Sequence, residues 1–328
     1  MRPMPTNPTH VAKRPTVYPV DMHAVIEAAA RIAPHAHVTP VLRSASLDAL
    51  AGCALHFKCE NFQRAGAFKF RGACNAVWSL SDAHAKLGVV THSSGNHGAA
   101  LALAARDRGI PAHVIVPEGA VASKLAAIRA YGATLHPCAP TMAAREAACA
   151  RVQAETGAEL VHPFTDARVI AGQGTAALEL LHVAQSLDAL IAPIGGGGLI
   201  GGTAVVARAQ SPDMPVFAAE PSGAADAFES MRQGRRVTDI VPHTVADGLR
   251  GIIGAINLEL LQRHRVEVLL VDEDEIVAAM RLLSARLKIV VEPSSATVFA
   301  AVLRHRGRFA GKRVGVIVSG GNTDTQQV

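Results

Sequence analysis

The chain has 328 residues, of which 49% are hydrophobic and only 4% are aromatic, and its formal net charge at pH 7 is +5. This composition is typical of a folded α/β protein and excludes a disordered chain. The basic residues are scattered in short clusters with few aromatic side chains among them, which argues against a nucleic-acid-binding surface.

The N-terminal residues MRPMPTNPTH contain prolines and no apolar segment, so we expect a frayed tail rather than a secretory signal. The next feature is a histidine pair, His35 and His37, before Pro40. Two histidines can contribute to a metal site, but nothing nearby completes a ligand set. A turn before the proline is therefore the preferred interpretation.

From residue 86 onward, short β-branched runs alternate with segments rich in alanine and leucine. This alternation predicts parallel sheets with right-handed crossovers and helices on both faces. Asp272 and Glu275 form a predicted N-terminal cap for a helix that runs to about Leu287. We expect strands at residues 88–91, 112–116, 133–136, 159–162, 189–194, 216–219, 266–271 and 314–318, and further helices at residues 99–108, 121–131 and 141–155.

One apolar segment resembles a membrane span in length, because nineteen uncharged residues separate Asp188 from Arg208. Six of these residues are glycine and one is proline, so the segment would form a poor continuous helix. A strand, a glycine loop and a helix in succession explain it better. We therefore expect no membrane association.

The cysteine pattern bears on the redox environment of the protein. The five cysteines, which have no CxxC spacing, are Cys53, Cys59, Cys74, Cys138 and Cys149. Neither a disulfide framework nor a thiolate zinc site is indicated. We expect a reducing, cytoplasmic location.

Three glycine-containing loops follow predicted strands, at residues 93–98, 195–198 and 319–322. In open α/β sheets, ligands lie at the carboxyl ends of strands, where backbone amides and helix N-termini meet anions. The four glycines of residues 195–198 would let amides surround a phosphate, although such a run can also be a close-packing turn. The loop lacks both GxGxxG and the Lys-Ser/Thr of a P-loop, so nucleotide binding is the weaker interpretation.

Lys69 lies in the sequence AFKFRG, between two phenylalanines. Desolvation lowers the pKa of a lysine, and the neutral amine is the form that Schiff-base chemistry needs. An isolated lysine is more often a surface residue with a buried stem. The neighbouring motifs favour the reactive interpretation.

Four motifs together resemble the fold-type II pyridoxal-phosphate enzymes, in the branch of serine racemases and serine/threonine dehydratases. The motifs are AFKFRG, SSGNHG at residues 93–98, the tetraglycine loop and SGGN at residues 319–322. The resemblance extends from about residue 20 to about residue 325. It implies a two-lobed fold like that of tryptophan synthase β, with a large cofactor-binding domain at residues 1–84 and 161–328. A small mobile domain would occupy residues 85–160.

The resemblance also implies roles at the cofactor. Lys69 would bind the aldehyde of pyridoxal phosphate covalently and then serve as the base on one face of the substrate α-carbon. Phe68 would pack on the pyridine ring, and Ser319 would face the pyridine nitrogen. The other implied cofactor contacts are Asn96 at the 3-oxygen, Gly195, Gly196, Gly197 and Gly198 at the phosphate, and Glu292 nearby.

For the substrate, the resemblance assigns the α-carboxylate to Ser93, Ser94, Asn96 and His97. Arg145 matches a family arginine near the substrate acid group, although from its local sequence it reads as a solvated helix residue. Ser94 also matches the acid or base that racemases of this branch place opposite the lysine. Alternatively, Ser94 only caps the helix that follows it.

A divalent-cation site is implied by the sequence AEPSGAAD, residues 219–226. Glu220 and Asp226 would supply carboxylate oxygens and Ala224 a carbonyl oxygen. Hard oxygen ligands suit Mg²⁺, with Ca²⁺ or Mn²⁺ as alternatives. By spacing alone, two such carboxylates are more often surface residues.

The resemblance implies an ammonia-lyase that converts L-serine, L-threonine or 3-hydroxyaspartate to a 2-oxo acid and ammonia. The second hypothesis is a serine or aspartate racemase with elimination as a side reaction. Ala67 in place of the commoner serine, and the absence of serine from residues 246–251, make racemisation the weaker of the two. A β-replacement enzyme and a non-catalytic binding module are further alternatives. The expected partners are a small amino-acid substrate and a second copy of the chain.

Overall fold

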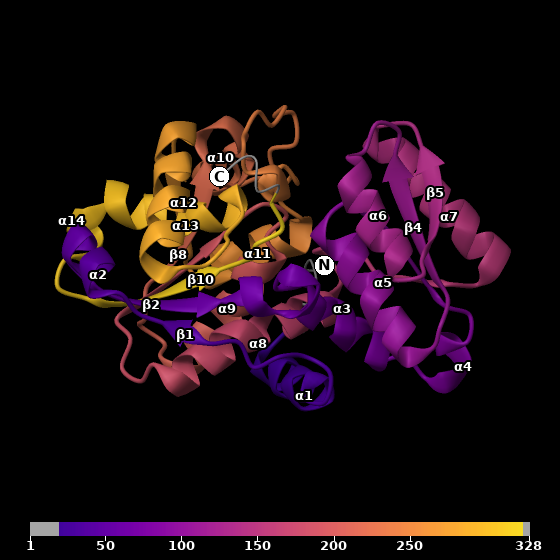
Figure 1. Cartoon of the computed structure of the whole chain (residues 1–328), viewed down its shortest axis with the longest axis horizontal. Coiled ribbons are helices and arrows are strands. Elements are labelled where there is room, and N and C mark those ends of the chain that lie inside the picture. The colour runs from indigo at the N-terminus through magenta and orange to yellow at the C-terminus, as the bar shows by residue number, and fades with distance from the viewer. Residues whose placement is uncertain (1–19, 324–328) are drawn as a thin grey trace, which may run out of the picture.

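The computed structural model describes residues 20–323. The frayed tail expected at the N-terminus therefore lies outside the described residues. The described strands form two sheets, which occupy opposite ends of the molecule (Figure 1). We call the six-stranded sheet with its helices the larger lobe, and the four-stranded sheet with its helices the smaller lobe.

The larger sheet has the strand order β1-β2-β10-β7-β8-β9. All neighbouring strands in it are parallel except β1 and β2. These two strands precede the alternating region of the sequence and were not predicted. The strands are β1 (Val41–Leu42), β2 (Ala54–Cys59), β7 (Ala189–Pro193), β8 (Val216–Pro221), β9 (Glu267–Val271) and β10 (Arg313–Val318).

The smaller sheet is fully parallel and has the order β5-β4-β3-β6. Its strands are β3 (Val89–His92), β4 (Ala112–Pro117), β5 (Thr134–Cys138) and β6 (Glu159–Leu160). All four lie within residues 85–160, the range that the sequence assigns to a small domain. The domain boundaries themselves remain a prediction.

The helices include those predicted from the sequence, with small shifts at their ends. The capping box of Asp272 and Glu275 is present at the start of α12. The helix predicted from residue 99 begins three residues earlier, at Asn96. The α-helices of the described chain are α1 (Met22–Ile32), α2 (Ala45–Ala51), α3 (Lys69–Trp78), α4 (Asp82–Ala85), α5 (Asn96–Arg108), α6 (Ala122–Ala130), α7 (Met142–Thr156), α8 (Ala167–Val183), α9 (Gly198–Gln210), α10 (Asp226–Gln233), α11 (Ala255–Arg263), α12 (Glu273–Leu287), α13 (Pro293–Arg304) and α14 (Arg306–Phe309).

Helices cover both faces of the larger sheet. Along β7, Ala189 and Ile191 belong to a buried cluster with residues of α12 and α13, whereas Leu190 and Ala192 belong to a cluster with residues of α8 and α9. Alternation of this kind is what a strand covered on both faces requires. The predicted α/β fold class is therefore confirmed.

The helix α3 joins the two lobes, because it packs against α8 of the larger lobe and against α5 of the smaller lobe. Gly172 allows a close approach between α8 and α3, since a Cβ on it would lie 2.6 Å from the Cα of Gly72. Lys69 begins this helix. The lysine of the AFKFRG motif is thus placed at the junction of the lobes (Figure 1).

The apolar segment after Asp188 is β7, a glycine turn and α9, as predicted. Between residues 20 and 323, no helix combines the length and the apolar character that crossing a membrane requires. All five cysteines are free. The predicted absence of a disulfide framework therefore agrees with the structure.

Candidate active site

A cavity of about 350 Å³ lies between the lobes, at the carboxyl ends of β3, β7 and β10. Ligands of open α/β sheets bind at this edge. All of the residues predicted to contact cofactor or substrate line the cavity, namely Phe68, Lys69, Ser93, Ser94, Asn96, His97, Arg145, Gly195, Gly196, Gly197, Gly198, Glu292 and Ser319. Asn96 and Gly320 lie 224 positions apart in the sequence, yet both lie next to Glu292.

Lys69 presents its amine to this cavity. The Nζ atom donates a hydrogen bond to the carbonyl oxygen of Pro163 at 2.9 Å and lies 5.0 Å from the centre of the Phe68 ring. Desolvation by burial lowers the pKa of Lys69 to about 8, and the carboxylate of Glu292 opposes this shift. A large fraction of the amine is neutral near pH 8, and the neutral amine is the form that attacks an aldehyde.

This pKa predicts how the protein binds the aldehyde cofactor implied by the sequence. We expect the rate of pyridoxal-phosphate binding to the apo-protein to rise with pH and to level off above about pH 8. Replacing Glu292 with glutamine should move the midpoint to lower pH, because an ionised carboxylate favours the charged amine. Stopped-flow visible absorbance measures the rate. A midpoint near the ordinary lysine pKa of 10.5 would contradict the environment described for Lys69.

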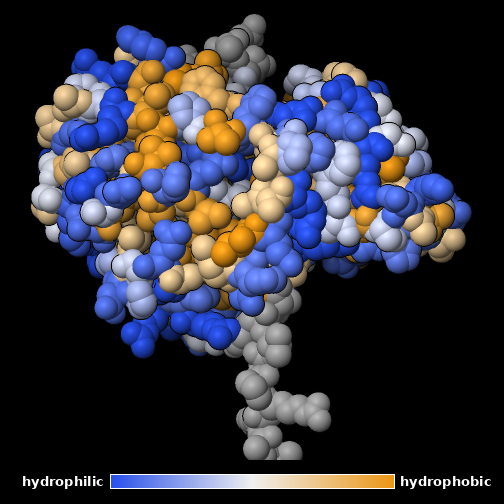
Figure 2. All heavy atoms as spheres, turned by 90° about the horizontal axis from the view of Figure 1, so that it is seen from below, coloured by the Kyte–Doolittle hydropathy of each residue, from blue (hydrophilic) through white to orange (hydrophobic). Residues whose placement is uncertain are grey.

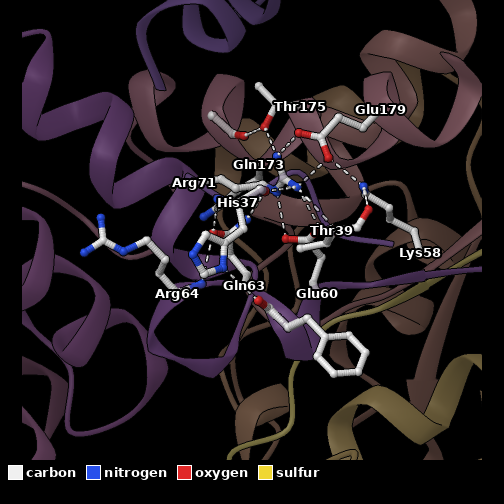
Figure 3. A network of polar contacts seen from close by, with 12 residues as sticks. His37, Thr39, Lys58, Glu60, Gln63, Arg64, Arg71, Gln173, Thr175 and Glu179 are labelled. Carbon is white, nitrogen blue, oxygen red and sulfur yellow. Dashed lines mark hydrogen bonds and ion pairs between the residues drawn. The ribbon is translucent and has the colours of Figure 1, made fainter. Parts of the chain in front are cut away.

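A buried network of charges around Arg71 anchors the helix that carries Lys69 (Figure 3). The fully buried Arg71 donates to both carboxylate oxygens of Glu60 and of Glu179, at 2.7 to 2.9 Å. Lys58 also donates to Glu179, so two cations face two carboxylates. Removing one partner of such a buried network is costly, because it leaves an uncompensated charge. The network therefore fixes α3 relative to β2 and α8.

Asn96 of the smaller lobe is held by two residues of the larger lobe. Its Nδ2 donates to both carboxylate oxygens of Glu292 at 3.1 Å, and its Oδ1 accepts from Asn322 at 2.9 Å. Burial raises the pKa of Glu292 to about 7, while the hydrogen bond from Asn96 opposes the shift. The prediction did not include Asn322, although it is the last residue of the SGGN motif. These contacts fix the orientation of the Asn96 amide at the cavity.

Ser319 follows β10 and is buried at the cavity. Its hydroxyl lies 3.0 Å from that of Ser295, which also donates to the carbonyl of Gly320 and accepts from the Gly320 N–H. Ser295 was not predicted, because nothing in its local sequence links it to Ser319. It positions the hydroxyl expected to face the pyridine nitrogen.

The glycines of residues 195–198 pack too closely for side chains. A Cβ on Gly196 would lie 2.3 Å from the ring of Phe164. Gly197 has a φ of +92°, which is the left-handed region that favours glycine. Because α9 begins at Gly198, its unpaired N-terminal amides lie beside the cavity, and such amides attract anions. Close packing is therefore observed, and an anion site is compatible with the same geometry.

The SSGNHG loop, residues 93–98, leads into α5. Gly95 is the N-cap residue of α5, and no side chain caps this helix end, so the interpretation of Ser94 as a helix cap is wrong. Ser93 accepts a hydrogen bond from the N–H of Gly95 at 3.3 Å. The ring of His97 is buried, with its Nε2 3.2 Å from the carbonyl of Val161, and burial lowers its pKa well below the usual range. His97 is therefore a neutral wall residue of the cavity.

Arg145 lies in the first turn of α7 and lines the cavity. Its Nε is buried and has no hydrogen-bond partner among the described residues. Burial lowers the pKa of His92, and the positive charge of Arg145 lowers it further. A buried donor without a partner is costly, and an anionic ligand group in the cavity would satisfy it.

The candidate cation residues lie outside the cavity, at the end of β8 and the start of α10. Both oxygens of Glu220 accept backbone N–H groups at 2.8 Å, and Asp226 accepts one at 2.7 Å. Burial, with repulsion from Asp226, raises the pKa of Glu220 to about 8, and burial raises that of Asp226 to about 6. In the part of the chain that the structure describes, no three His, Cys, Asp or Glu side chains are grouped for metal binding. A cation here would rely on two carboxylates, the Ala224 carbonyl and water.

Of the histidine pair before Pro40, His35 lies in the turn preferred from the sequence, whereas His37 lies in the irregular segment just after it. The ring of His35 stacks on Trp78 with 3.9 Å between ring centres. The backbone carbonyl of His37 accepts hydrogen bonds from Gln63 and Arg71. The His35 ring is thus packed against Trp78, while His37 is held through its backbone and by its Nδ1, which lies 3.1 Å from the carbonyl oxygen of Phe62.

Comparison with known proteins identifies the family. Residues 32–320 match the model described as pyridoxal-phosphate dependent enzyme. The β-hydroxyaspartate dehydratase of Paracoccus denitrificans is 49% identical over 91% of this chain and 95% of that protein. The serine racemase of Dictyostelium discoideum is 46% identical over 94% of this chain and 97% of that protein. The solved structure of maize serine racemase superposes with a TM-score of 0.92 at 45% identity, covering 94% of this chain and 95% of that chain.

Proposed function

The chain belongs to the family of pyridoxal-phosphate dependent enzymes, and from this premise we propose that it is an ammonia-lyase for 3-hydroxyaspartate. The net reaction converts 3-hydroxyaspartate to oxaloacetate and ammonia. Water is lost from the α- and β-carbons, and a water molecule is used again when the resulting enamine is hydrolysed. L-serine and L-threonine, which share the β-hydroxyl group, are the weaker candidate substrates.

The unpartnered guanidinium of Arg145 is the observation that carries this proposal. A 3-hydroxyaspartate molecule has a second carboxylate on its β-carbon, whereas serine and threonine have none. The buried Nε of Arg145 lacks a partner among residues 20–323, and the two oxygens of a carboxylate could accept from this N–H and from a terminal N–H of the same guanidinium. The dehydratase relative from Paracoccus denitrificans is named for the same compound and supports the choice.

The remaining cavity residues can perform the other parts of the reaction. Bound pyridoxal phosphate supplies an electron sink that makes the α-proton of an amino acid acidic. Lys69 can remove that proton, because its amine is the base with a lowered pKa in the cavity. The amides at the start of α5 can bind the α-carboxylate beside Ser93 and Ser94. Asn96, which is held by Glu292 and Asn322, would contact the cofactor ring oxygen.

A substrate panel tests the proposed function. Purified holoenzyme is incubated with 3-hydroxyaspartate, L-serine and L-threonine, and the oxo acid and ammonia are measured. We expect kcat/KM for 3-hydroxyaspartate to be at least about tenfold higher than for L-serine, since the charged contact with Arg145 is worth more than about 1.4 kcal/mol. A preference for L-serine would contradict the proposal.

Racemisation is the second candidate, and Ser94 favours it. Ser94 lines the cavity together with Lys69, and transfer of a proton on each face of the α-carbon would invert its configuration. Chiral analysis of the same incubations separates the two reactions. An excess of D-serine over pyruvate from L-serine would reverse the ranking.

We also propose a divalent cation, Mg²⁺ in the first place, at Glu220, Asp226 and the carbonyl of Ala224. Two buried carboxylates with raised pKa values are costly to ionise unless a cation compensates them. Between pH 4.5 and about 8, folding without a cation requires Glu220 to stay protonated while the unfolded chain ionises. The unfolded state then binds fewer protons, so stability falls as the pH rises.

Chelation should therefore lower the melting temperature by about 5 °C at pH 8. The effect should be much smaller near pH 5, because Glu220 and Asp226 are then mostly protonated and bind a cation poorly. Differential scanning fluorimetry with and without chelator measures this difference. The variant Glu229→Gln, at a half-buried position on α10 where the carboxylate pairs with Arg232, serves as the control. An unchanged melting temperature and unchanged activity after thorough chelation would contradict the cation site.

The chain is also proposed to form a homodimer. Viewed from below, hydrophobic side chains gather over the larger lobe, while the smaller lobe is mostly hydrophilic (Figure 2). Exposed apolar surface of this kind marks interaction sites. Light scattering coupled to size-exclusion chromatography tests the association, and a monomer at micromolar concentration would contradict it.

A further inference from the structure

Asn257 connects the glycine loop to the segment that contacts Lys69. It lies near the start of α11 and is fully buried. Its Nδ2 donates to the carbonyl oxygen of Gly196 at 2.5 Å and to that of Phe164 at 2.8 Å. Since both neighbours are carbonyl oxygens, only the NH₂ side of the amide can face them.

These contacts decide which way one peptide of the glycine loop points. The carbonyl of Gly196 also accepts the N–H of Gly254 at 3.1 Å, so two donors pull it toward α11. In a trans peptide the carbonyl of one residue and the N–H of the next point in opposite directions, and the described chain has no cis peptide bonds. The N–H of Gly197 is therefore turned away from Asn257, and Gly197 is one of the residues that line the cavity.

The packing around the loop is close on both sides of this peptide. A Cβ on Gly197 would lie 2.7 Å from the Cβ of Asn257, and one on Gly196 would enter the ring of Phe164. The loop is thus enclosed between these two side chains. Because the fit is close, a rotated peptide would have to displace one of them.

The same amide also connects the two ends of the cofactor region. The carbonyl of Phe164, which it binds, belongs to the residue after Pro163, and the Pro163 carbonyl accepts the hydrogen bond of Lys69. One side chain therefore contacts both the glycine loop and the residue next to the acceptor of the lysine amine. Its Oδ1, in contrast, is buried and has no partner among the described residues, which is a cost to stability rather than a gain.

We propose that Asn257 is a positioning residue that orients the Gly196–Gly197 peptide so that its N–H binds the phosphate of pyridoxal phosphate. This inference depends on the cofactor of the family and not on the identity of the amino-acid substrate. The proposed role of Asn257 also differs from a purely structural role in one measurable respect. A residue that orients a phosphate donor affects ligands with the phosphate group and leaves ligands without it unchanged.

The test compares pyridoxal phosphate with pyridoxal, which has the same aldehyde and ring but no phosphate. Dissociation constants of both are measured by visible absorbance for the apo-protein and for Asn257→Leu. We expect the dissociation constant of pyridoxal phosphate to rise at least about tenfold and that of pyridoxal to change less than about threefold, because one charge-assisted hydrogen bond is lost. The ³¹P resonance of the bound cofactor should also move.

Thr203→Val is the matched control, because Thr203 is a fully buried polar residue of α9 whose hydroxyl bonds only within its own helix. It should leave both constants within about threefold of the parent. Equal weakening of the two ligands by Asn257→Leu, or no weakening, would overturn the proposal. If Asn257→Leu does not fold, the isosteric Asn257→Asp, which removes the NH₂ group, is judged by the same ratio. Failure of both variants to fold would assign Asn257 to the fold and overturn the proposal as well.

Discussion

Replacing Lys69 with alanine is expected to remove the yellow colour of the purified holoenzyme and to lower kcat for elimination by about 10³-fold or more. Two functions are lost together, because the same amine is proposed to bind the cofactor aldehyde and to remove the α-proton. The geometry supports this double role, since the amine lines the cavity and burial lowers its pKa to about 8. Visible absorbance and the ammonia assay measure the two losses separately.

The control for this experiment is Lys86→Ala, which removes a lysine charge at an exposed position after α4. Its colour and activity should match those of the parent protein. Thermal melting of the Lys69→Ala apo-protein verifies that the fold is intact. A Lys69→Ala protein that stays yellow and turns over substrate at the parent rate would refute the assignment.

Replacing Arg145 with methionine is expected to lower kcat/KM for 3-hydroxyaspartate about 10²-fold and to change kcat/KM for L-serine by less than about threefold. Methionine keeps much of the volume and loses the charge. Only a substrate with a second carboxylate uses the guanidinium, so the loss should depend on the substrate. Lysine at this position should restore part of the activity, because it keeps the charge without the bidentate geometry.

The matched control is Arg151→Met on the same helix, where the arginine is exposed and paired with Glu155. It should leave both substrates unaffected, since exposed ion pairs contribute little. An equal loss on 3-hydroxyaspartate and L-serine in Arg145→Met would show that Arg145 serves the fold or the α-carboxylate. No loss on either substrate would remove it from the substrate site.

Local sequence signals predicted the elements that depend on neighbouring residues. The capping box of Asp272 and Glu275 and the β-branched run of β10 are properties of a few adjacent positions, and both are found in the structure. In contrast, β2 contains Lys58 and His56 in its interior, which interrupted the apolar pattern. Lys58 is buried there because Glu179, distant in sequence, neutralises it. Such a long-range ion pair leaves no trace in the local pattern.

In the candidate site, too, features of the local sequence could be predicted and long-range contacts could not. Motif residues such as Lys69 and Ser319 could be predicted because each lies in a recognisable local sequence. Ser295 and Asn257 could not, because their roles arise only from hydrogen bonds to loops that are distant in the chain. Phe164 was missed for a similar reason, since its importance lies in the ring that excludes a side chain from Gly196.

The most direct test of the central claim is chemical mapping of the cofactor attachment site. The holoenzyme is reduced with borohydride, which converts a lysine Schiff base to a stable secondary amine, and its peptides are analysed by mass spectrometry. We expect one phosphopyridoxyl group per chain, on the peptide that contains Lys69. Its appearance on another lysine, such as Lys58 or Lys124, or its absence from every peptide, would contradict the account.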